Sequence, residues 1–71
     1  MFVFKFARSG KIGWDEAVGF VVVAASAMDA LVMVQDACGD EGPDAWARAK
    51  VTVIGKAKIP AGIVLRDFRA G

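Results

Sequence analysis

GFVVVAASAMDALVMV, residues 19–34, decides the fold, because it is almost wholly apolar and its single charged residue is Asp29. A membrane-spanning helix needs about 20 mostly apolar residues. A carboxylate near the centre of such a helix costs roughly 2.5–3.5 kcal/mol on insertion scales. The run of valines also suits a strand better than a helix. We therefore predict a strand followed by a helix, and no membrane span.

The two predicted elements meet at Ser26. Residues 18–25, VGFVVVAA, are predicted to form a strand that is apolar on both faces. The Ser26 hydroxyl can cap the following helix, and Asp29 favours the positive end of that helix. Gly39 is expected to end it in a left-handed turn, which gives a helix over 27–38. Helical spacing predicts an inward stripe of Ala27, Ala30, Leu31, Val34 and Cys38.

The flanking sequence predicts three further strands, over residues 2–7, 51–57 and 63–68. Turn-forming residues after the first strand indicate a hairpin with the second, and the last two strands are predicted to form another hairpin. Gly55 is expected to mark a bulge. Pro43 favours a short helical turn that packs Trp46 onto the main helix or the sheet. The fold class predicted is α+β: a four-stranded, largely antiparallel sheet with one helix on one face, in β-β-α-β-β order.

The length and composition of the chain indicate its domain number and its oligomeric state. A chain of 71 residues is a single small domain over 1–71, and 56% of its residues are apolar. One helix can cover only one face of four strands, whereas a strand that is apolar on both faces normally has cover on both. We therefore predict a homodimer, packed sheet against sheet or edge against edge.

The charged residues divide into a basic start, an acidic middle and a basic end, although the net charge is only +1. Opposite charges on separate faces can steer a partner, and a mixed solvated surface is the plainer interpretation. Cys38 is the single cysteine, which is typical of an intracellular chain, and no signal peptide is recognisable. We expect a cytoplasmic location.

No catalytic constellation is predicted. The sequence contains no histidine to act as a base, Ser26 is explained as a cap, and Cys38 as a small core residue. The acidic residues from Asp36 to Asp44 lack the spacing of a calcium loop, and the glycines near residue 10 lack the lysine of a phosphate loop. We expect no enzyme activity, no metal and no cofactor.

Nucleic-acid binding is the alternative. Its candidate residues share the predicted last hairpin, and Phe68 lies on the same side of its strand as one of them. A sheet with basic and aromatic side chains can bind single strands, but phosphate binders usually carry a clear basic excess. The candidates are Lys56, Lys58, Arg66 and Arg69.

Two short motifs carry a resemblance. The first is GDEG followed by a tryptophan, and the second is a closing V-L-x-x-F-x-A-G. The matching residues are Gly39, Asp40, Glu41, Gly42, Trp46, Val64, Leu65, Phe68, Ala70 and Gly71. The chain resembles small uncharacterised proteins of actinobacteria and their phages, and Arg69 departs from that pattern. The resemblance implies a phage or prophage accessory protein that engages a host protein or a defence component in the host cytoplasm.

We therefore predict a non-enzymatic interaction protein whose partner is another protein. The predicted contact anchors are Trp14, Trp46 and Phe68, with Asp40 and Glu41 as a polar rim. Trp14 has a second interpretation as a lid on the edge of the core. A minor virion or scaffold component is a further reading, in which the chain would form higher assemblies.

Overall fold

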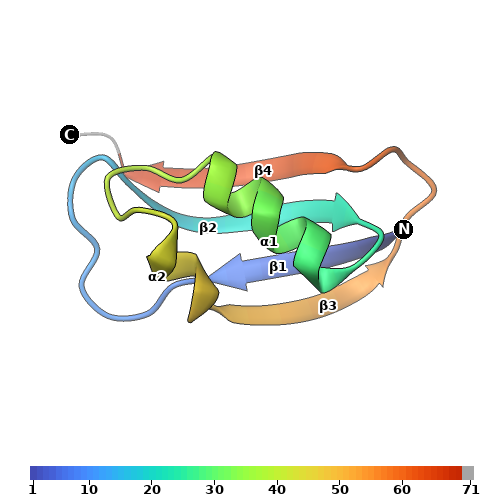
Figure 1. Ribbon diagram of the computed structural model, residues 1–71, viewed down its shortest axis with the longest axis horizontal. Helices are drawn as coiled ribbons and strands as arrows, with labels where there is room; N and C mark the ends of the chain where they lie inside the picture. The colour runs from blue at the N-terminus through green and yellow to red at the C-terminus, as the bar shows by residue number, and fades with distance from the viewer. Residues whose placement is uncertain (70–71) are drawn as a thin grey trace.

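Four strands form one antiparallel sheet, and two helices follow the second strand (Figure 1). The computed structural model describes residues 1–69. The order across the sheet is β3-β1-β2-β4, and α1 crosses one face of it. This confirms the predicted α+β class and the β-β-α-β-β order. The elements are β1 (Phe2–Ala7), β2 (Glu16–Ala24), α1 (Ala27–Asp36), α2 (Asp44–Ala47), β3 (Lys50–Lys56) and β4 (Gly62–Arg69).

The central hairpin of β1 and β2 is present as predicted, but the second hairpin is not. β3 pairs with β1 and β4 pairs with β2, so the last two strands occupy opposite edges of the sheet. Residues 57–61 join them around the end of the sheet, where Ala57 N–H donates to the Met1 carbonyl at 3.1 Å. The three strand spacings to be crossed total roughly 14 Å. Five extended residues reach about 17 Å, so the short connection suffices.

The start of α1 follows the sequence prediction. Ser26 has an extended backbone, and its hydroxyl oxygen accepts from the Asp29 N–H at 3.2 Å. Asp29 lies in the first turn, where its charge is favourable. The strand before it ends at Ala24, one residue earlier than predicted.

The end of α1 differs from the prediction. The helix ends at Asp36, and the N–H of the capping residue Ala37 bonds back to carbonyls of the last turn. Gly39 therefore does not end the helix, and it is not among the glycines with a left-handed backbone. It is a site of close approach instead, because a Cβ there would overlap the Asp15 carbonyl oxygen and lie 2.7 Å from the Phe68 ring.

The core lies between α1 and the sheet face that α1 covers. Phe20 and Trp46 meet edge to face with ring centroids 5.0 Å apart, so α2 packs onto the sheet as predicted. Of the predicted inward stripe, Ala30 and Val34 are buried, Leu31 and Cys38 pack against the core, and Ala27 is exposed. The stripe was therefore wrong at Ala27. The core residues are Phe4, Phe6, Ala17, Phe20, Val22, Ala24, Ala30, Val34 and Trp46.

The outer strands are not paired regularly along their length. The register changes from Val3↔Gly55 to Phe4↔Val53, which leaves Ile54 without a partner and confirms the bulge predicted at Gly55. Similar shifts occur between β2 and β4 at Val18 and Val64. Neither helix within residues 1–69 has the length and apolar character that a membrane crossing requires.

Candidate functional site

The sheet face opposite α1 is the candidate site, and we call it the open face. Both helices lie on the other side of the sheet (Figure 1). Because paired residues of neighbouring strands point to the same face, the register arranges the open face in three rows across β3, β1, β2 and β4. The rows are Gly55, Val3, Val23 and Gly62; then Thr52, Lys5, Val21 and Leu65; then Lys50, Ala7, Gly19 and Asp67.

Apolar side chains of the open face surround the exposed Lys5 at its centre. Val23 is buried, Val3 and Val21 are half-buried, and the side chain of Leu65 is 57% exposed at the outer strand. A hollow of about 190 Å³ lies over Gly19, where no side chain rises from the sheet. A strand that is apolar on both faces is usually covered on both, and here the helices cover only one.

The charged side chains of the open face are few. Lys5 and Asp67 lie on opposite sides of the hollow over Gly19, and Lys50 shares the row of Asp67 at the far edge. The ion pair found in residues 1–69 joins Arg8 and Glu16, so none of these three open-face charges is part of an ion pair. The open face is thus basic at the β3 edge and acidic at the β4 edge.

The predicted rim residue Glu41 points inward. Its Oε1 accepts from the backbone N–H groups of Ala17 and Gly39, both at 2.9 Å. Its Oε2 accepts from the Trp46 indole N–H at 2.6 Å. We call this arrangement the Glu41 knot. It ties the start of β2 and the loop after α1 to α2, and it satisfies the indole of a tryptophan that is only 1% exposed.

The pKa of Glu41 reflects two opposing effects. Partial burial of the carboxylate acts to raise the pKa. Hydrogen bonds from the N–H of Ala17, the Trp46 indole, its own N–H and the N–H of Gly39 act in the other direction. The hydrogen bonds prevail, so the pKa of Glu41 lies below its ordinary value of 4.5 and the side chain is a carboxylate at neutral pH.

The predicted contact anchors separate into buried and exposed residues. Trp46 is buried, which corrects its assignment as a partner contact, and the half-buried Glu41 carboxylate is occupied by its three hydrogen bonds. Trp14 is 62% exposed and is therefore no lid; the Arg69 guanidinium lies 4.1 Å above its ring. Phe68 packs against the core, and Asp40 is exposed. The structure therefore does not gather the five predicted residues into one surface.

The four basic residues of the nucleic-acid alternative do not lie together either. Lys56 ends β3 and Lys58 follows it, whereas Arg66 and Arg69 lie on β4 at the other edge. Arg66 donates to the Ala37 carbonyl at 3.0 Å, and its guanidinium lies over the Phe68 ring. Arg69 donates to the Ile12 carbonyl at 3.1 Å. The expected last hairpin, which would have brought all four together, is absent.

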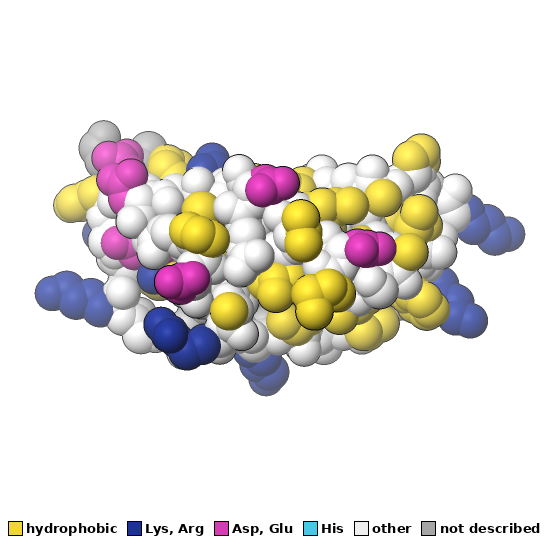
Figure 2. Space-filling view, viewed as in Figure 1, with side chains coloured by type: hydrophobic (Ala, Val, Ile, Leu, Met, Phe, Trp, Pro, Cys, Tyr) yellow, Lys and Arg dark blue, Asp and Glu magenta, His cyan; other side chains and the backbone are white. Residues whose placement is uncertain are grey.

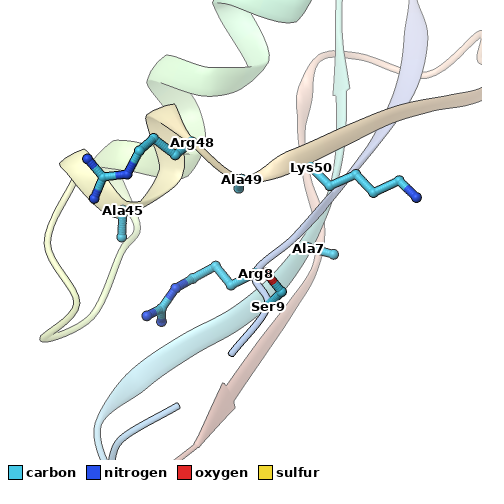
Figure 3. Close-up of a pocket in the computed structure, with 7 residues that line it drawn as sticks. All are labelled: Ala7, Arg8, Ser9, Ala45, Arg48, Ala49 and Lys50. Atoms are coloured by element: carbon cyan, nitrogen blue, oxygen red, sulfur yellow. The ribbon is translucent and has the colours of Figure 1, made fainter. Parts of the chain in front are cut away.

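A polar cavity of about 270 Å³ lies at the end of the sheet near α2 (Figure 3). Arg8 is held there by the Ala17 carbonyl at 2.8 Å and by Glu16 at 3.2 Å. Figure 3 shows Arg8 and Arg48 extending to one side and Lys50 to the other, so their charges do not converge on one anion. Ser9 is the hydroxyl in the lining, and no base accompanies it. The lining residues are Ala7, Arg8, Ser9, Ala45, Arg48, Ala49 and Lys50.

The face that carries α1 also exposes apolar side chains (Figure 2). Met28 and Val32 are exposed on α1, and acidic side chains are scattered among the apolar ones on this face. In residues 1–69, no group of three or more potential ligands stands close enough to hold a metal ion. The open face was not found from the sequence because its rows depend on the strand order, although the two apolar faces of β2 pointed toward it.

Comparison of the chain with protein-family models, with curated proteins and with solved structures finds no match.

Proposed function

We propose that the chain is a non-enzymatic protein-interaction module that binds another protein through the open face. The observation that supports this most is the apolar group of half-buried Val3 and Val21 and exposed Leu65 on the open face, which neither helix covers. Apolar sheet faces of this kind are normally buried against a second layer. Here a partner supplies that layer.

A protein partner fits the open face better than a nucleic acid does. Binding to a phosphate backbone requires a clear basic excess. The open face carries the acidic Asp67 as well as Lys5 and Lys50. The basic residues outside it are divided between two edges of the sheet, and the net charge is +1. The sequence resemblance to phage-encoded proteins makes a host protein one partner of this class, and a second copy of the chain is another.

Site-specific photo-crosslinking tests the proposal. The photoreactive residue p-benzoylphenylalanine replaces Leu65 on the open face or, as a control, Val32 on α1. The two positions are matched in exposure, at 57% and 51%. Purified protein is irradiated alone and in a cell extract. We expect discrete protein adducts from position 65 that are lost when Val21→Glu is added, and none from position 32. Equal adducts from both positions, or none from position 65, would overturn the proposal.

A nucleic-acid control completes the test. Binding to a single-stranded oligonucleotide is titrated at two salt concentrations, because phosphate contacts weaken steeply as salt rises. We expect no salt-dependent binding. Tight binding that weakens with salt, and that falls in an Arg66→Glu variant, would favour the alternative module instead.

A further inference from the structure

The charge pattern of the open face identifies the partner. We infer that two copies of the chain pack open face to open face about a two-fold axis parallel to the strands, with Lys50 of one copy opposite Asp67 of the other. This inference rests on the proposed function, since it names the protein that covers the open face. It follows from the order of residues in the three rows.

The symmetry operation makes specific pairings. An axis parallel to the strands, midway between β1 and β2, places β3 of one copy over β4 of the other and β1 over β2, without moving any residue to another row. In the charged row, Lys50 therefore meets Asp67 at both edges, and Ala7 meets Gly19 in the middle. The Ala7 methyl of each copy faces the hollow over Gly19 of the other.

The first row is complementary in size. Val3 of one copy lies over the buried Val23 of the other, and Gly55 lies over Gly62 at the edges. The four glycines at the two edges of this row carry no side chains that would hold the sheets apart, so the half-buried Val3 side chains can approach the other copy. Packed sheets lie about 10 Å apart, a distance that a lysine and an aspartate can span together.

The middle row places Lys5 opposite Val21 and Thr52 opposite Leu65. The carbon stem of a lysine packs well on apolar surface while its ammonium extends to a polar site. In this arrangement Asp67 of the other copy lies in the neighbouring row and over the neighbouring strand. Each Asp67 thus faces two ammonium groups of the other copy, from Lys50 directly and from Lys5 diagonally.

A two-fold axis in the sheet plane but perpendicular to the strands gives a poorer match. It reverses the rows, so that Lys50 meets Gly55 and Asp67 meets Gly62. All six charges of the two open faces would then be buried or crowded without an opposite charge directly facing them. Unpaired charges in an interface are costly, so the charge pattern selects the axis parallel to the strands.

The size of the open face sets the expected affinity. Four strands about 4.8 Å apart and three rows about 6.8 Å apart give roughly 400 Å² of flat area per copy. The two copies together give roughly 800 Å² before side-chain relief is counted, which is below the roughly 1,200–2,000 Å² of stable complexes and typical of weak ones. We expect a dimer with a dissociation constant of roughly micromolar order.

Charge reversal tests this geometry by sedimentation equilibrium of the full chain over a range of concentrations. Lys50→Asp and Asp67→Lys each place like charges opposite one another at both edges. We expect each to raise the dimer dissociation constant at least about ten-fold, and the double variant to return it to within about three-fold of wild type. The matched controls are Lys56→Asp, which pairs with Phe2 on the α1 side, and Asp36→Lys on α1. Neither control should change the constant by more than about two-fold, and circular dichroism verifies the fold of each variant.

The outcomes separate this inference from the proposed function. A wild-type chain that stays monomeric to about millimolar concentration, yet cross-links from position 65 to a different protein, overturns the dimer and leaves the interaction module standing. A wild-type dimer that the double variant fails to restore, or that the controls weaken equally, overturns the arrangement about the strand-parallel axis. A monomer with no protein adduct from position 65 overturns both.

Discussion

Replacing Glu41 with glutamine should destabilise the fold strongly, although it changes one atom of a half-buried side chain. The carboxylate accepts three N–H groups, from Ala17, Gly39 and the Trp46 indole. The side-chain amide of a glutamine at this position would have a single acceptor oxygen. If that oxygen keeps the two backbone donors, the amide nitrogen faces the indole N–H, which is 2.6 Å from the present Oε2. Two donors then oppose each other inside the core.

The magnitude follows from this count of hydrogen bonds. Loss of one hydrogen bond to a charged group costs about 1.5–3 kcal/mol. The two remaining bonds become neutral ones, which are roughly half as strong. Because Glu41 is only half-buried, solvent offsets part of this cost, and we expect Glu41→Gln to lower the free energy of unfolding by at least about 2 kcal/mol. For a domain of this size, the melting temperature should fall by at least roughly 8 °C.

Urea unfolding monitored by tryptophan fluorescence measures the effect, with wild type and variant at one protein concentration. Asp40→Asn is the matched control, because it removes a charge from the same turn on an exposed side chain. We expect the control to change the free energy of unfolding by less than about 0.5 kcal/mol. A Glu41→Gln variant within that same margin of wild type would refute the structural role of the Glu41 knot.

The pH dependence of stability provides an independent check. Because the pKa of Glu41 is lowered in the folded chain, the unfolded chain binds more protons between the folded pKa and the ordinary value of 4.5. The stabilisation from this carboxylate is therefore complete above about pH 4.5 and is lost as the pH falls through the folded pKa. The difference in stability between wild type and Glu41→Gln should narrow as the pH is lowered from 4.5 through the folded pKa. A constant difference would contradict the assignment.

Three further variants test other parts of the structure by thermal unfolding. Gly39→Ala should lower stability by at least about 2 kcal/mol, since its Cβ would overlap the Asp15 carbonyl oxygen and crowd Phe68. Ser26→Ala should cost about 1 kcal/mol through loss of the helix cap, whereas Ser26→Asp should cost little. Asp36→Lys should raise stability by about 0.3–1 kcal/mol, because the last turn of α1 has no basic residue.

The local elements could be predicted from the sequence. The alternation of phenylalanines predicted β1 with the bounds that the structure has, and Ser26 located the start of α1 because a cap is a contact between near neighbours in the chain. Gly55 located a bulge for a similar reason: a glycine inside a strand weakens regular pairing at that point.

The elements that depend on distant contacts could not be predicted. Neighbouring strands in sequence usually pair, and this rule placed β3 beside β4. The β1–β2 hairpin instead has two free edges, and each outer strand pairs with one of them. The same error brought Lys58 and Arg66 together as one nucleic-acid surface. Gly39 was assigned a left-handed turn because the approach of Asp15 is invisible in the sequence.

Glu41 and Trp46 were also misplaced as contact residues. A carboxylate in a predicted turn is normally expected to be solvated. The sequence GDEG, residues 39–42, does not show which of its two acidic side chains points inward. The adjacent residues have opposite environments: Asp40 is exposed, and Glu41 bonds to the indole of Trp46. The spacing of five residues between Glu41 and Trp46, across a proline, is the sequence feature that accompanies this contact.

The two faces of the sheet have different roles: the α1 side stabilises the fold, and the open face is where we propose that the chain associates. The core and the Glu41 knot lie on the α1 side, where Phe20 and Trp46 meet and the buried donors are satisfied. Asp67 and Lys50 lie on the open face and make no ion pair among residues 1–69. Charge reversal at Lys50 should therefore change self-association while leaving the unfolding of the monomer nearly unchanged, and Glu41→Gln should do the reverse. If the open-face variants unfolded as readily as Glu41→Gln when monomeric, the open face would be part of the folding core, and its exposure would no longer indicate a partner.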